Sequence, residues 1–291
     1  MKDVRVDAWN AFGTNRLGLD GTGFPLTVDV SASQGIHIVN GTAARACDLI
    51  DVLSSAAQNT AVVLNIDHYS WLDPHGDPLR SREIARQQGV QFAAHDITWT
   101  QARGSAPSDL LTMSWNDLHR FFDGNWSHYG ADIMDAEGPL PDDVADEVAL
   151  AFHLQGQDSW LLREFPQSRV FYSGHDDCYL HVQSTDPTMP ARILTRLIAL
   201  FGGSALLDEH SESVMVAEPQ LSMAENMLRE SEHWVGTVLT SDPCGQVTMG
   251  FTPTRWRLGS PLSDDFSLHL TFDLKSQTWD THRSDNVVSR D

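Results

Sequence analysis

The most restrictive feature of the sequence is a strand–turn–strand–helix pattern between residues 168 and 208. RVFYS and CYLHVQS predict two strands around the turn GHDD, because Gly and Asp are typical of tight turns. TDPTMPARILTRLIALFGG then carries apolar residues at the spacing of one helix face. Asp186 is the expected N-cap, Pro187 the first helical residue and Gly202-Gly203 the end, followed by a strand in SALLDE. Such a segment predicts antiparallel strands with a helix packed on them.

Residues 24–66 predict the same order of elements. FPLTVDV and GIHIVN resemble strands, GTAARACDLIDVLSSAAQ has helical spacing, and AVVLNID resembles a buried strand. We therefore predict an α+β fold of mainly antiparallel sheets flanked by helices, formed as a single unit over residues 1–291. The alternative is two similar strand–turn–strand–helix–strand lobes, 24–106 and 168–280, joined by a helical acidic segment, 107–165. This internal duplication requires residues 24–66 to superpose on residues 168–208.

The remaining segments complete the prediction of a β-rich C-terminal third. SREIARQQG, SWNDLHRFFDG and PLPDDVADEVALAFHL predict helices, the second with a capping box between Ser114 and Asp117. VQFAA predicts a strand, and so do WVGTVLTS, QVTMGFT and DFSLHLTFD, with DPCG as the hairpin turn between WVGTVLTS and QVTMGFT. The first 23 residues are expected to be irregular, and HRSDNVVSRD is expected to be a tail.

The charge of the chain restricts its partners. The 291 residues include 40 Asp and Glu but only 19 Lys and Arg, for a formal net charge of −21. Such a protein repels nucleic acids and anionic membranes and attracts basic proteins. An acidic, arginine-preferring composition is also typical of whole proteomes of some bacteria, which is the alternative explanation. Without a membrane-spanning run or an apolar leader, the chain is expected to be cytoplasmic.

The acidity is concentrated between Phe121 and Leu162, where no Lys or Arg occurs. A block of this kind is commonly a solvated face, but aromatic residues within it could anchor a cationic partner. The tip of the 169–183 hairpin is a second expected contact. The predicted partner-binding residues are Trp126, Tyr129, Asp132, Asp135, Glu137, Asp142, Asp143, Asp146, Glu147, His175, Asp176 and Asp177.

Metal binding is the main alternative function. In DHYSWLDPHGDP, His68, His75 and Asp77 are suitable ligands for zinc, manganese or iron, although a polar surface loop is the favoured explanation of this stretch. The dipeptides His95-Asp96 and His175-Asp176 occur in strand and turn patterns. Metal-dependent phosphohydrolases of the HD class carry this dipeptide on a helix, so it does not indicate that class here.

No sequence pattern supports another kind of catalysis. GxSxG, phosphate-binding and dinucleotide-binding patterns are absent, and the cysteines at 47, 178 and 244 are expected to be reduced thiols. We therefore predict no catalytic residues and no cofactor. The favoured function is an acidic cytoplasmic binding protein that neutralises a basic protein, such as a bacterial immunity protein inhibiting a toxin. The alternative is a metal-dependent hydrolase using the loop at 67–77, and the sequence leaves the oligomeric state open.

Overall fold

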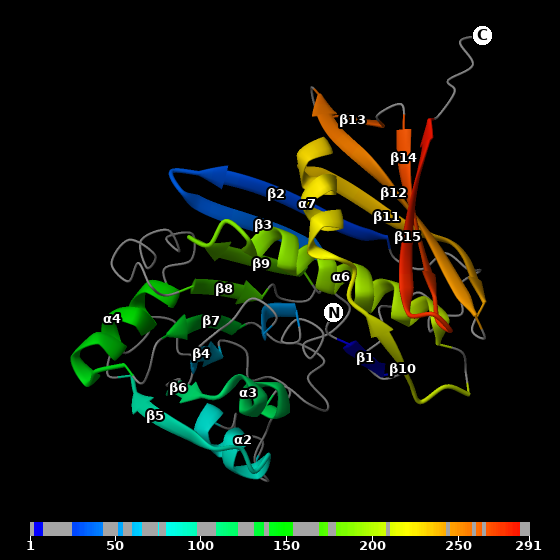
Figure 1. Cartoon of the computed structure of the whole chain (residues 1–291). Coiled ribbons are helices and arrows are strands. Elements are labelled where there is room, and N and C mark those ends of the chain that lie inside the picture. Colours follow the sequence, from blue (N-terminus) through cyan, green and yellow to red (C-terminus); the bar gives the residue numbers. More distant parts are fainter. Residues whose placement is uncertain are drawn as a thin grey trace. The chain divides into compact units, whose positions relative to one another are not determined.

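The chain forms two compact units, which we describe separately from a computed structural model (Figure 1). Unit 1 comprises Met1–Ser31, Val39–Asp48 and Thr188–Asp291, and unit 2 comprises Ala32–Ile38 and Leu49–Pro187. The structure describes residues 3–7, 25–42, 52–54, 60–65, 75, 80–97, 109–121, 131–136, 140–153, 169–173, 179–207, 210–242, 245–257, 260–263 and 266–285. Within these ranges, no helix is both long enough and apolar enough to cross a membrane.

Unit 1 contains an antiparallel sheet in the order β15–β14–β12–β11–β2. Its strands are β2 (Leu26–Ser33), β11 (His233–Asp242), β12 (Gln246–Arg257), β14 (Phe266–Asp273) and β15 (Thr278–Asp285). β3 (Ile36–Thr42) lies next to β2, and β13 (Ser260–Ser263) pairs with β12. A separate two-stranded sheet joins β1 (Asp3–Asp7) to β10 (Ser213–Ala217).

The sheet of unit 1 has one apolar and one hydroxyl-rich face because its strands alternate. In β12, Val247, Met249 and Phe251 are buried, whereas Thr248 lies on the other face and its hydroxyl is 3.0 Å from that of Thr271 in β14. Gly236 in β11 is opposite Phe251, and a Cβ at that glycine would lie 2.5 Å from the ring. The aromatic ring therefore occupies the space that a side chain would need.

The apolar helix α6 (Met189–Leu206) forms the core of unit 1 together with these strands. It contacts β1, β10, β11 and β12, and it also packs against α7 (Leu221–Glu230) (Figure 1). A Cβ at Gly203 would lie 2.6 Å from a methyl group of Val6 and 2.9 Å from one of Val216. Gly203 thus allows β1 and β10 to approach the helix closely, which explains why this glycine does not end it.

Unit 2 contains antiparallel strands in the order β9–β8–β7–β4–β6–β5. Its strands are β4 (Thr60–Asn65), β5 (Phe92–Asp96), β6 (Asp109–Met113), β7 (Ala131–Ala136), β8 (Arg169–Ser173) and β9 (Tyr179–Ser184). The helices are α2 (Ser81–Gln87), α3 (Trp115–Phe121) and α4 (Asp142–His153). Val62, Leu110 and Met134 of the sheet pack against Ala145 and Val148 of α4, which forms the core next to that helix.

The α+β class is confirmed, and so are the two predicted hairpins. β8 pairs with β9, and Val170 is opposite Gln183. β11 pairs with β12, and Asp242 is opposite Gln246 beside the turn. The predicted end of α6 is wrong, since the helix continues to Leu206, which is the third residue of the expected strand SALLDE. The helix also begins at Met189, later than predicted, with Thr188 as N-cap.

Seven described elements were not predicted. They are β1, which lies in the lead-in expected to be irregular, and β6, β7, β10, α7, β13 and β15. The expected tail is also wrong in its first residues, because β15 continues to Asp285. The two compact units have other boundaries than the lobes 24–106 and 168–280, and the internal duplication stays a prediction.

Candidate functional site: a polar network and an acidic helix face

Two of the predicted partner-binding residues are buried. Asp132 and Asp135 lie in β7, which pairs with β4 on one side and β8 on the other, and their exposed fractions are 3% and 0%. The indole Nε1 of Trp115 donates to Oδ1 of Asp135 over 3.1 Å. Because buried carboxylates are not available to a partner, we remove both residues from the proposed surface.

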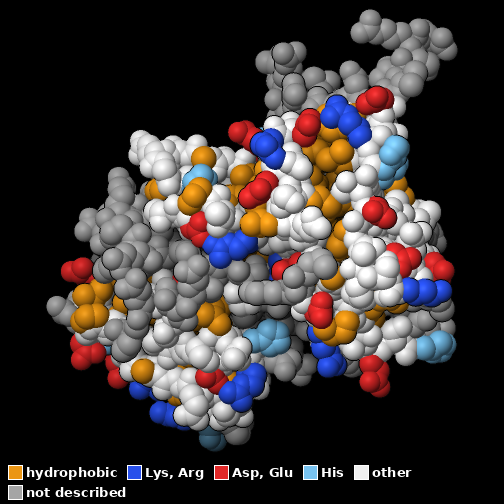
Figure 2. Space-filling view, in the orientation of Figure 1, with side chains coloured by type: hydrophobic (Ala, Val, Ile, Leu, Met, Phe, Trp, Pro, Cys, Tyr) orange, Lys and Arg blue, Asp and Glu red, His pale blue; other side chains and the backbone are white. Residues whose placement is uncertain are grey.

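Three other predicted residues lie on the outer side of α4. Asp142 is fully exposed, Glu147 is exposed and Asp146 is half-buried. Ala145 and Val148 of the same helix are buried against the sheet. The 3.6-residue period therefore separates an apolar inner side from an acidic outer side. Figure 2 shows acidic side chains distributed over the face in view, among fewer Lys and Arg.

The remaining predicted residues are not tested by the structure. Trp126, Tyr129, Glu137, His175, Asp176 and Asp177 lie outside the described residues, and so do the metal-ligand candidates His68 and Asp77. The side chain of Asp143 is also outside them. His75 is described and is exposed in a turn. Within the described part of the chain, no group of three or more His, Cys, Asp or Glu side chains could hold a metal ion.

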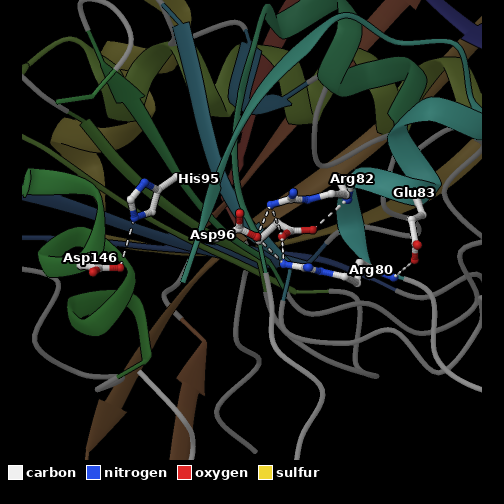
Figure 3. A network of polar contacts seen from close by, with 7 residues as sticks. Arg80, Arg82, Glu83, His95, Asp96 and Asp146 are labelled. Atoms are coloured by element: carbon white, nitrogen blue, oxygen red, sulfur yellow. Dashed lines mark hydrogen bonds and ion pairs between the residues drawn. The ribbon is translucent and has the colours of Figure 1, made fainter. Parts of the chain in front are cut away.

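A polar cluster in the described part of unit 2 joins two aspartates to two arginines (Figure 3). Asp96 at the end of β5 and Asp109 at the start of β6 are directly opposite each other in the strand register. Like charges in this position repel each other. Arg80 and Arg82, at the start of α2, each contact both carboxylates and offset that repulsion.

Ion pairs and hydrogen bonds from both arginines hold this cluster together. A terminal nitrogen of Arg82 lies 2.7 Å from Oδ1 of Asp109, and its backbone N–H donates to Oδ2 of the same residue over 3.2 Å. The side chain of Asp109 is fully buried, whereas that of Asp96 is 65% exposed. The hydrogen bond from Arg80, assisted by Arg82, lowers the pKa of Asp96 below its usual value. Hydrogen bonding to Asp109 similarly raises the pKa of Arg82.

His95 connects the other face of β5 to α4. Its Nε2 lies 3.1 Å from Oδ1 of Asp146, and its Nδ1 lies 3.6 Å from Oδ1 of Asp142. Successive strand residues point to opposite faces, so His95 and Asp96 have different neighbours (Figure 3). The side chains of His95 and Asp96 therefore do not converge on one point.

Chemically, the cluster is suited to fixing structure. Terminal nitrogens of both guanidinium groups contact the aspartates. The Nε atoms of Arg80 and Arg82 are buried and have no hydrogen-bond partner in the described part of the chain. Arg80, Arg82 and Asp109 were not among the site residues predicted from the sequence. A signal was present, because positive charge at a helix N-terminus is opposed by the helix dipole and implies nearby carboxylates.

Comparisons of the chain with protein-family models, with curated proteins and with solved structures found no match. The functional proposal therefore depends on the charge and geometry of the chain itself.

Proposed function

We propose that the chain is an acidic binding protein that captures a basic protein partner through the outer side of α4. The observation that carries the proposal is the separation of this helix into a buried apolar side and an exposed side bearing Asp142, Asp146 and Glu147. Carboxylates exposed in this way accelerate encounter with a cationic surface and select against acidic partners. A cytoplasmic inhibitor, such as an immunity protein that neutralises a toxin, is the form of this function that we expect.

Two properties of the chain support this proposal over a purely structural role for the acids. The first is the net charge of −21, which attracts a cationic partner over a longer distance than a single side chain does. The second is the position of Glu147 beyond the first turn of α4, where stabilisation of the helix dipole does not require a carboxylate. His95 holds Asp146 near β5, and thereby fixes part of the acidic side.

The test begins with the partner captured by the chain from its native host and identified by mass spectrometry. The purified partner is expected to be basic, and the association rate is expected to fall steeply as salt concentration rises. The double variant D142N/E147Q is expected to slow association about tenfold at low salt. Stopped-flow or surface-based kinetics measure this change.

A matched control removes two exposed acids from unit 1. Glu212 and Glu225 are both exposed, and E212Q/E225Q changes the net charge by the same amount as D142N/E147Q. The control is expected to change the rate much less. An acidic partner, or equal effects of the two double variants, would show that the outer side of α4 is not the binding surface.

A further inference from the structure

Two histidines lie side by side on neighbouring strands of unit 1. His269 in β14 and His282 in β15 are directly opposite each other in the antiparallel register. Their ring centroids are 6.4 Å apart, and the ring planes are inclined by 65°. Directly opposed residues project from the same face of a sheet with Cβ atoms about 5 Å apart. The two imidazoles can therefore reach one common ligand.

This pair lies on the face of the sheet opposite the apolar core. The neighbour of His269 along β14, Leu270, is buried on the core side, whereas His269 is half-buried and His282 is exposed. Arg283 follows His282 and points to the other face, where its guanidinium carbon lies 3.8 Å from the centroid of Phe266. The alternation thus places both histidines on the opposite face from Arg283, which is the neighbouring cationic side chain on β15.

The geometry points to an open, two-histidine site for a divalent transition metal, and we propose that His269 and His282 bind Cu²⁺, Ni²⁺ or Zn²⁺. Neutral imidazole is a preferred ligand of these ions. Two histidines on one tetrahedral ion, at metal–nitrogen distances of about 2.0–2.1 Å, place their ring centroids about 5 Å apart. Side-chain rotation of partly exposed rings closes the difference from 6.4 Å.

The surroundings favour a cation and leave its coordination sphere open. Asp280 lies on the same face of β15, two residues before His282, and is exposed. Its carboxylate and the net charge of −21 raise the local concentration of cations. Since no third protein ligand completes a metal-binding group among the described residues, the remaining coordination positions belong to water.

The first test is a titration of the full chain with Cu²⁺, followed by calorimetry and by electron paramagnetic resonance. The wild type is expected to bind one Cu²⁺ at this site with two imidazole nitrogens. H269F and H282F retain a ring suited to a strand, but each removes one ligand and is expected to weaken this binding about tenfold or more, because the second ligand no longer acts at high effective concentration.

The matched control is H37F, which removes a half-buried histidine from another strand, β3. It is expected to leave the affinity unchanged, which distinguishes a specific pair from general binding by the 13 histidines of the chain. Equal affinities for the wild type, H269F and H282F would overturn the proposal. Equal weakening by H37F would overturn it as well.

A second measurement needs no variant and so does not depend on the folding of one. Substoichiometric Cu²⁺ broadens the nuclear magnetic resonance signals nearest to the bound ion. The ring signals of His269 and His282 are expected to disappear first. If the signals of other histidines broaden first and these two persist, the metal binds elsewhere and the pair serves only the contact between β14 and β15.

Discussion

The helices α6 and α4 each pack against strands of their own unit, but they differ in how many of their side chains are exposed. In α6 every residue except Arg192 is buried, and the helix carries no acidic residue in its first turn. Among the described side chains of α4, Ala145, Val148 and Ala149 are buried, whereas Asp142 and Glu147 are exposed. A helix buried all round is restricted by packing at nearly every position. The outer side of α4 is free of that restriction, so its sequence can serve binding.

The largest effect is expected from shortening a side chain of α6. Phe201 is 1% exposed, and F201A should lower the free energy of unfolding by about 3–5 kcal/mol, because it removes buried apolar surface and leaves a cavity. Chemical denaturation with regional hydrogen exchange measures the loss in unit 1. F201L leaves a larger side chain than F201A and should therefore lower the free energy of unfolding by less. If F201A changed stability by less than 1 kcal/mol, roughly the cost of a surface change, the contrast with α4 would fail.

The second prediction concerns the network of unit 2, where packing and charge are combined. D109N should lower the free energy of unfolding by about 2 kcal/mol, because Arg80 and Arg82 lose their buried ionic partner while remaining partly solvated. Regional hydrogen exchange should locate the effect at α2 and at the β5–β6 hairpin. D96N is the matched control, and it should change stability less because Asp96 is largely exposed. If D96N destabilised the protein more than D109N, the buried carboxylate would not be the more important of the two.

A smaller effect is expected at the start of α3. Ser114 Oγ accepts a hydrogen bond from the backbone N–H of Asp117 over 3.0 Å, and its hydroxyl donates to the carboxylate of Asp117 over 2.7 Å. S114A should cost about 1 kcal/mol through the loss of this cap. The hydrogen bond from Ser114 is also the largest cause of the lowered pKa of Asp117.

The pH dependence of that cap has a definite sign. Because the folded pKa of Asp117 lies below its unfolded value, its contribution to stability is present above pH 3.8 and is lost as the pH falls through the folded pKa. S114A should raise the pKa of Asp117 and reduce this loss in acid. Nuclear magnetic resonance titration measures the pKa, and an unchanged value would show that Ser114 does not control it.

The smallest effect is expected on the outer side of α4 itself. The variant D142N/E147Q should change the free energy of unfolding by less than about 1 kcal/mol, because the side chains are exposed and only Asp142 lies in the first turn. Thermal denaturation checks this value. A loss as large as that of F201A would mean that the acids of α4 stabilise the unit as strongly as the core does. The two helices would then not differ in the way described above.

The sequence predicted features whose causes lie within a few residues. The contact between Ser114 and Asp117 was predicted because the two residues are three positions apart, and the DPCG turn was predicted because its chemistry is local. The helical spacing in α6 was equally clear. Its end was not, because Gly203 serves a close approach to Val6 and Val216, which are distant in the sequence.

The polar network was missed for the same physical reason. Asp109 meets Arg80 through the pairing of β5 with β6 and the placement of α2, and no periodicity within either segment reveals that meeting. Asp132 and Asp135 were predicted to lie on the surface, but they are buried. They belong to a block without Lys or Arg, so composition suggested a surface, whereas the pairing of β7 on both sides makes them interior residues.

The pairing of β1 with β10 has a consequence for biosynthesis. Asp3 is opposite Ala217 in that register, so β1 leaves the ribosome long before its partner strand exists. The segment Leu49–Pro187 of unit 2 is continuous and is completed during this interval. Until Ser213–Ala217 is translated, β1 exposes an unpaired edge and the apolar side chains of Val4 and Val6. β1 is therefore available for wrong strand pairing until Ser213–Ala217 has been translated.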